Sequence, residues 1–120
     1  MDSDQFSQRL AAVRQRFAAK LTTRIHDTET GLPKLAGDGP AVIDDLVETY
    51  HRIHELCGMG ATVGFAATSR AARTMEQMLL EPYRARRPLT PSEIERLRPA
   101  LDALRAAAKV DCETNGIPAE

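Results

Sequence analysis

Apolar residues recur every three or four positions along most of the chain, and this spacing predicts four amphipathic helices. The first helix is expected from residue 4 to about residue 27. Its apolar face is predicted to consist of Phe6, Leu10, Val13, Phe17, Leu21 and Ile25. The following stretch, 28–39, contains three glycines and one proline. That density of helix breakers predicts a loop, and this loop should be the longest connection in the chain.

A second helix is predicted to begin near Pro40, because proline favours the first helical position, and to end at Gly58 or Gly60. Its core face should hold Ile43, Leu46, Tyr50, Ile53 and Cys57. Glycines weaken a helix interior, so the chain is expected to reverse between Gly60 and Gly64. A third helix should then run antiparallel to the second. Its predicted buried face comprises Phe65, Thr68, Ala72, Met75, Leu79 and Pro82.

The clearest helix start is a capping box formed by Thr90 and Glu93, with Pro91 at the first helical position. The buried face of this fourth helix should contain Ile94, Leu97, Leu101, Leu104 and Ala108. Pro99 lies inside the helix, where proline removes a backbone hydrogen bond and costs roughly 3 kcal/mol. A kink near residues 95–98, or a break, is therefore expected. Residues 113–120 are predicted to form a loose tail.

Four amphipathic helices bury their apolar faces most simply in an antiparallel up-down-up-down four-helix bundle, so the predicted fold class is all-α. The length of 120 residues and the hydrophobic content of 42% suit a single domain over residues 1–120. A fold of this kind hosts many activities, and the function has to be inferred from a site.

Charge and composition exclude several classes of partner. The 16 basic and 17 acidic residues nearly cancel, which argues against nucleic acid or an anionic membrane surface as the partner. No apolar run approaches the ~20 residues of a membrane span, and the acidic N-terminus does not fit a secretory signal. Cys57 and Cys112 are too few and too isolated for a disulfide framework or a metal site. We expect a cytoplasmic, monomeric protein without a bound metal.

The candidate chemistry lies around His54 in the second helix. Gly58 follows four residues later, and on a helix these two positions lie one above the other, so no side chain crowds the imidazole. His54 is expected at the edge of the buried face and half exposed. His51, one turn earlier, has Glu55 at the corresponding place and is interpreted as a surface residue.

The run from His54 to Gly58, followed by Gly64 and Phe65 and then by Ala72–Glu76, resembles the signature of the histidine-containing phosphotransfer (HPt) domain. The resemblance implies a phosphorelay carrier. His54 would accept a phosphoryl group from the aspartyl phosphate of a receiver domain and pass it to the aspartate of another response-regulator receiver. A hybrid histidine kinase is a further implied partner. Magnesium would come from the receiver, so this chain is expected to need no cofactor.

The chain departs from the family pattern at two places. Cys57 stands where the family usually has a lysine three residues after the histidine. Arg73, expected opposite His54 on the third helix near residues 72–76, is a candidate replacement for that cation. Glu76 stands where some relatives have a glutamine that bonds near the histidine. Its charge would repel a phosphate, so either Glu76 points away or the phosphohistidine is less persistent.

Two functions from different classes therefore remain. One is the carrier, and the other is a degenerate scaffold or inhibitor that binds a receiver or kinase without carrying phosphate. The chain lacks a glycine-rich phosphate loop, so it should not phosphorylate itself from ATP. A partner should form a modest, transient interface over His54. The residues expected in that interface are Arg52, Glu55, Gly58, Ala61 and Arg73.

Overall fold

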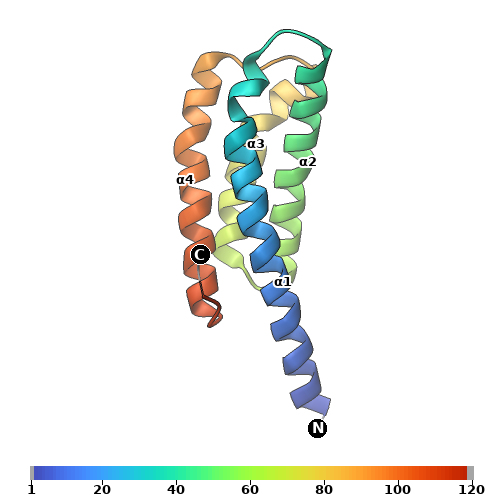
Figure 1. Ribbon diagram of the computed structural model, residues 1–120, viewed down its shortest axis with the longest axis vertical. Helices are drawn as coiled ribbons and strands as arrows, with labels where there is room; N and C mark the ends of the chain where they lie inside the picture. The colour runs from blue at the N-terminus through green and yellow to red at the C-terminus, as the bar shows by residue number, and fades with distance from the viewer. Residues whose placement is uncertain (1, 119–120) are drawn as a thin grey trace.

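The computed structural model describes residues 2–118, which form four α-helices and one short 3-10 helix (Figure 1). The elements are α1 (Asp2–Gly31), η1 (Leu32–Ala36), α2 (Pro40–Val63), α3 (Ala66–Ala85) and α4 (Pro91–Thr114). No strand occurs among the described residues. The predicted all-α class is confirmed.

The four α-helices lie side by side in an elongated bundle with principal extents of 56 × 21 × 19 Å (Figure 1). The α1–α2 and α3–α4 connections meet at one end, and the α2–α3 turn lies toward the other (Figure 1). A backbone hydrogen bond of 2.8 Å from Leu89 N to Leu35 O joins the first two connections. This bond links the two connections at the end of the bundle opposite the α2–α3 turn.

The predicted end of the first helix is wrong, because α1 continues to residue 31 and η1 follows directly. Thr28 is buried, and its hydroxyl donates to Arg24 O at 2.8 Å. Leu32 and Leu35 are fully buried and add to the core. Pro33 lies in the first turn of η1, where a missing amide hydrogen costs little. The expected long loop is thus reduced to residues 37–39.

The predicted core faces are confirmed most closely in α3 and α4. All six residues predicted for α3 are buried, and α4 buries Ile94, Leu97, Leu101 and Leu104, with Ala108 half-buried. A break at Pro99 is not observed, since α4 is continuous from Pro91 to Thr114. Pro99 is exposed, so water can satisfy the Glu95 carbonyl that proline leaves without a partner.

The predicted faces of α1 and α2 are only partly buried. Phe17, Leu21 and Ile25 belong to the core, whereas Phe6 is 67% and Val13 36% exposed. The first turns of α1 extend beyond the bundle (Figure 1), so no other helix covers them. In α2 the core face is rotated slightly from the predicted one. Its buried residues are Val42, Leu46, Thr49, Ile53, Leu56, Cys57, Gly60 and Val63.

A glycine ends α2 and starts the turn into α3. Gly64 adopts a left-handed backbone with φ of 87°, and Phe65 N donates to Gly60 O at 2.7 Å. Gly60 is buried, and a Cβ there would lie 3.3 Å from Phe65 O and from Ser69 N. The predicted end of the second helix at Gly58 or Gly60 is therefore wrong, because α2 continues to Val63. The expected reversal occurs at Gly64, and the glycine at 60 is needed for close helix packing.

The outer helices cap both ends of this turn. Arg14 of α1 donates from Nε to Val63 O at 2.9 Å, which pairs a carbonyl in the last turn of α2. The buried carboxylate of Asp111 in α4 accepts a hydrogen bond of 2.7 Å from Thr68 N in the first turn of α3. The α2–α3 pair that carries the candidate histidine is therefore held from both sides.

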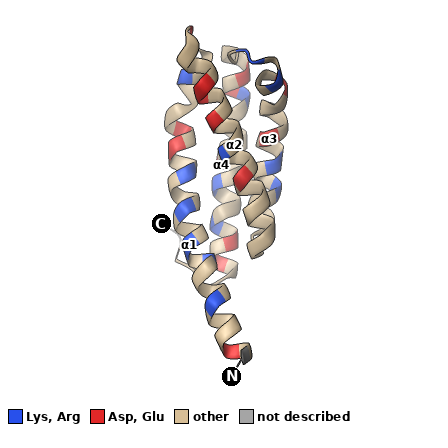
Figure 2. Cartoon of the chain, turned by 90° about the vertical axis from the view of Figure 1, so that its right-hand side faces the viewer, with Lys and Arg blue, Asp and Glu red and all other residues tan. Residues whose placement is uncertain are grey.

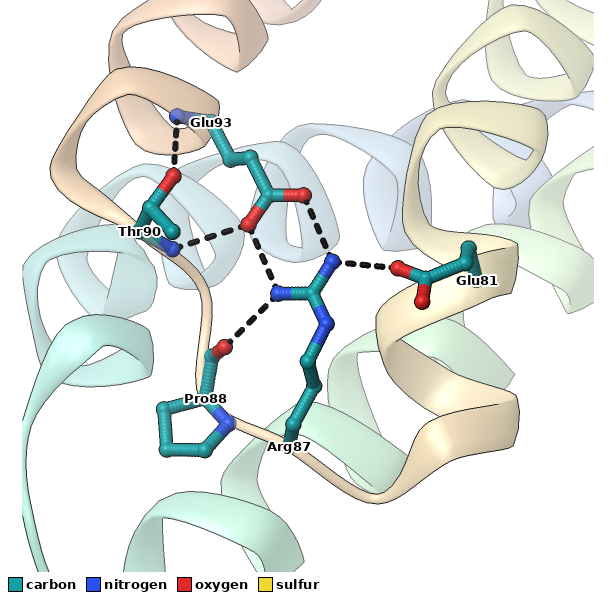
Figure 3. Close-up of polar contacts among 5 residues, drawn as sticks. All are labelled: Glu81, Arg87, Pro88, Thr90 and Glu93. Carbon is teal, nitrogen blue, oxygen red and sulfur yellow. Dashed lines mark hydrogen bonds and ion pairs between the residues drawn. The ribbon is translucent and has the colours of Figure 1, made fainter.

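The α3–α4 connection is held by a polar network around Arg87 (Figure 3). Its guanidinium donates to the two carboxylate oxygens of Glu93 at 2.9 and 3.0 Å and also contacts Glu81. Glu93 accepts from Thr90 N at 2.9 Å, and Glu93 N donates to Thr90 Oγ1 at 3.1 Å, which confirms the predicted capping box. Hydrogen bonding to Arg87 lowers the pKa of Glu93 to about 2.

The expectation of a loose tail does not hold for residues 113–117. Residues 113 and 114 belong to α4, and Ile117 N donates to Cys112 O at 2.8 Å. Gly116 takes a left-handed φ of 69°, which turns the chain back so that Ile117 packs on the core. Residues 119 and 120 lie outside the described part of the chain.

Lys and Arg are interspersed with Asp and Glu over the helices (Figure 2). Within residues 2–118, no helix has the length and apolar content needed to cross a membrane.

Candidate functional site

His54 lies on the outer side of α2 with its side chain 69% exposed. Its neighbours Ile53 and Cys57 are buried, which places the imidazole at the edge of the core face, as expected. The side chain is more exposed than the predicted half. A ring in this position is open to a second protein while its backbone stays in a rigid helix.

Glu76 of α3 reaches across to His54 and contacts its Nδ1 atom. Residues near 72–76 were expected opposite His54, and this contact confirms that part of the prediction. The suggestion that Glu76 points away is wrong. A carboxylate only accepts hydrogen bonds, so the imidazole in this contact carries its hydrogen on Nδ1. Within the described residues no protein group forms a hydrogen bond with Nε2, and the ring that carries this atom is 69% exposed.

Gly58 is exposed one turn after His54, and a Cβ placed there would meet no atom within 4 Å. This differs from Gly60, whose missing Cβ allows α3 to approach. Packing therefore gives no reason for glycine at 58. The open space beside the imidazole is available to a ligand or a partner.

Cys57 does not face the imidazole. It is 6% exposed, and its carbonyl accepts a hydrogen bond of 2.8 Å from Ser69 Oγ across the α2–α3 contact. Its burial confirms the prediction that Cys57 belongs to the core face of the second helix, as a small apolar residue, and it lies away from the position from which a lysine would meet the phosphoryl group. Cys57 and Cys112 are both free and buried. Within residues 2–118 no group of three or more His, Cys, Asp or Glu side chains is placed to hold a metal ion.

Arg73 is exposed on α3, one turn before Glu76, so the two side chains share one face of that helix. No ion pair involves Arg73 among the described residues, and no contact joins it to His54. The guanidinium therefore lies beside the site and is available to an anion brought by a partner.

The predicted partner residues divide between two faces of α2. Arg52 is only 14% exposed and bonds to Thr28 of α1 at 3.4 Å. Glu55 lies 3.9 Å from Arg24, also on α1. Both point toward α1, and Arg52 leaves little surface for a partner. Ala61 is exposed on the same face of α2 as the imidazole, two turns further along.

A pair of stacked tyrosines extends the site and was not predicted. The rings of Tyr50 and Tyr83 are nearly parallel with centroids 3.9 Å apart, and Tyr50 lies parallel to His54 at 6.2 Å. His51 Nε2 is 3.1 Å from the Tyr83 hydroxyl. Burial, with Glu76 and Tyr83 nearby, raises the pKa of Tyr50. The spacing of Tyr50 and His54 by four residues was visible in the sequence, whereas Tyr83 depended on the α2–α3 register.

No curated protein and no solved structure matches the chain significantly. The family model described as the Hpt domain matches residues 6–107, a range that includes the imidazole, its carboxylate partner and most of each of the four helices. The chain therefore belongs to the Hpt domain family.

Proposed function

We propose that this protein is a phosphorelay carrier in which Nε2 of His54 accepts a phosphoryl group from a receiver-domain aspartyl phosphate and passes it to another receiver. Membership of the Hpt family indicates phosphotransfer in a two-component system. The observation that supports His54 as the acceptor is its exposed ring, with Nδ1 engaged by Glu76 and Nε2 free. His51 fits less well, because its Nε2 contacts the Tyr83 hydroxyl.

The chemistry requires little from this chain. The Nε2 lone pair attacks phosphorus, the bond between phosphorus and the aspartate oxygen breaks, and the electron pair leaves on the carboxylate. Neutral imidazole needs no separate base for this step. Glu76 sits at the ring nitrogen that does not react, so its charge is kept away from the incoming phosphoryl group. The space at Gly58 admits the in-line approach.

The docking face we propose runs along the outer seam between α2 and α3 of an antiparallel, up-down-up-down bundle. It contains the imidazole, Gly58, Ala61 and Arg73, all of which are exposed. Arg73 would meet the phosphoryl oxygens in place of the lysine found in relatives. Magnesium would be contributed by the receiver. A cytoplasmic monomer that meets a hybrid kinase and a response regulator in turn is consistent with such a transient face.

A transfer assay tests the acceptor. A receiver charged with radiolabelled phosphate by a small phosphodonor is mixed with wild type, His54→Gln, His51→Gln and the surface control His26→Gln. Label that is acid-labile and base-stable is expected on wild type, His51→Gln and His26→Gln, and not on His54→Gln. Label that persists on His54→Gln would reject His54 as the acceptor.

The same assay separates the carrier from the scaffold that binds without carrying phosphate. The carboxylate at Glu76 and the missing lysine at Cys57 are the features that favour the scaffold. Binding of a receiver to wild type without any transfer of label would support that second function.

A further inference from the structure

We propose that Glu76 makes the phosphorylated His54 a short-lived donor, by holding the hydrogen on Nδ1 throughout the transfer cycle. This inference rests on the proposed function and concerns the lifetime of the phosphoryl group at that site. Glu76 is the positioning residue, since it acts through the imidazole and does not meet the phosphoryl group. The observation behind it is the direct contact between a carboxylate oxygen and the ring nitrogen.

The location of Glu76 gives this contact its strength. Its side chain is 18% exposed, whereas the imidazole it meets is 69% exposed. The partly buried carboxylate is therefore on the protein side of the ring, and the reacting nitrogen is on the solvent side. No cation forms an ion pair with Glu76 within the described residues other than the imidazole itself. Its negative charge is thus available to the ring.

The charge on the ring changes during the reaction. When Nε2 bonds to phosphorus and Nδ1 keeps its hydrogen, the imidazole becomes a cation. A carboxylate at Nδ1 favours this protonated ring over the phosphorylated ring that has lost the Nδ1 hydrogen, and it does so more than a neutral amide. When the phosphoryl group leaves, the bond between phosphorus and Nε2 breaks and the electron pair returns to Nε2. The leaving group is then neutral imidazole. Without the hydrogen on Nδ1 it would be an imidazolate anion, which leaves far more slowly.

Glutamine at position 76 provides the comparison, because it keeps the size and an acceptor oxygen but loses the charge. Wild type, Glu76→Gln and the exposed α4 control Glu95→Gln are charged directly with phosphoramidate, which requires no receiver. The half-life of the phosphohistidine at neutral pH is then measured. We expect Glu76→Gln to lengthen the half-life about tenfold, equivalent to about 1.4 kcal/mol, and Glu95→Gln to leave it unchanged.

A second measurement is the tautomer of the His54 ring, which would be the same in wild type and Glu76→Gln if Glu76 had only a structural role. In spectra of protein labelled with ¹⁵N in histidine, the unphosphorylated wild type should show His54 with its hydrogen on Nδ1, and Glu76→Gln should show a mixture of tautomers. Unfolding midpoints of the two proteins establish that both are folded.

The outcomes are distinguishable. Equal half-lives in wild type and Glu76→Gln, or an imidazole in wild type with its hydrogen on Nε2, would overturn the role of Glu76 and leave the carrier intact. A wild type that takes no phosphoryl group from phosphoramidate or from any receiver would overturn the carrier and this inference with it.

Discussion

At the scale of single residues, two glycines of α2 serve different purposes. Gly60 is buried, and a Cβ there would press on the backbone of α3 at 3.3 Å. Gly58 is exposed and would accept a Cβ without any contact. The fold explains the first glycine, and only the proposed transfer explains the second. Side chains on a helix lean toward the preceding turn, so a larger residue at 58 would cover His54.

Substitution of Gly58 should separate stability from transfer. Gly58→Ala is expected to stabilise the fold by about 0.5–1 kcal/mol, because alanine is the better helix former. Gly58→Leu should also fold, and it should slow transfer from a charged receiver by about tenfold to 100-fold, because it displaces the partner from the reacting geometry. Urea unfolding and a timed transfer assay measure the two effects. Transfer by Gly58→Leu at the wild-type rate would show that the space is not used.

At the scale of elements, each end of the α2–α3 pair is tied to its surroundings by polar contacts. Arg14 and Asp111 cap the turn at Gly64, and Arg87 joins α3 to α4 at the other end (Figure 3). Glu93 receives two bonds from that guanidinium and also closes the capping box. These contacts fix α2 to α1 and α3 to α4, on either side of the pair that carries the imidazole and its carboxylate partner.

The pair of Arg87 and Glu93 predicts a pH-dependent stability. The folded pKa of Glu93, about 2, lies below its ordinary value of 4.5. Its stabilisation is therefore complete above pH 4.5 and is lost as the pH falls toward 2. Glu93→Gln keeps an acceptor for the cap but loses the charge, and should lower the unfolding free energy by about 1 kcal/mol at neutral pH.

Urea unfolding at neutral pH and at about pH 3 measures this effect, and the difference between Glu93→Gln and wild type should be smaller at the lower pH. Glu95→Gln is the control, since its 71% exposed side chain pairs with Arg98 within one turn of α4. If the difference in unfolding free energy between Glu93→Gln and wild type were the same at both pH values, the ion pair of Arg87 and Glu93 would contribute nothing to stability.

At the scale of the whole molecule, α1 is joined to the α2–α3 turn by an aromatic contact. Phe17 and Phe65 meet edge to face with centroids 5.2 Å apart, and both are almost fully buried. The N-terminal turns of α1, which include the 67% exposed Phe6, project past this contact. The core of the bundle therefore extends along α1 as far as Phe17, and the first turns of α1 lie outside it.

Alanine substitutions in α1 should report this difference. Phe17→Ala is expected to destabilise the fold by about 3–5 kcal/mol, because it removes a buried ring and leaves a cavity. Phe6→Ala removes the same side chain from an exposed position and should change stability by less than about 0.5 kcal/mol. Chemical unfolding of both variants is the measurement. Similar losses in the two would contradict the assignment of the core.

The helical period was sufficient to predict the core faces of α3 and of α4 as far as residue 108, because the apolar residues there recur at helical spacing and other helices cover them. It was insufficient at residues 28–36, because Gly31 and Pro33 lie at the start of η1, where a helix tolerates them. It was also insufficient at Phe6, because the apolar spacing of α1 continues into turns that no other helix covers. His54 and Gly58 were recognisable from local spacing. The contacts of Glu76 and Tyr83 depend on how two helices align, which no local pattern contains.

The central claim is that phosphate is carried on Nε2 of His54. The chain has three histidines, so a long-range ¹H–¹⁵N spectrum of the ¹⁵N-histidine protein, recorded after charging by a receiver, can assign each ring. Coupling to phosphorus is predicted at one nitrogen alone, Nε2 of His54, with hydrogen retained on Nδ1. Phosphorus coupled to His26, to His51 or to Nδ1 of His54 would contradict the account.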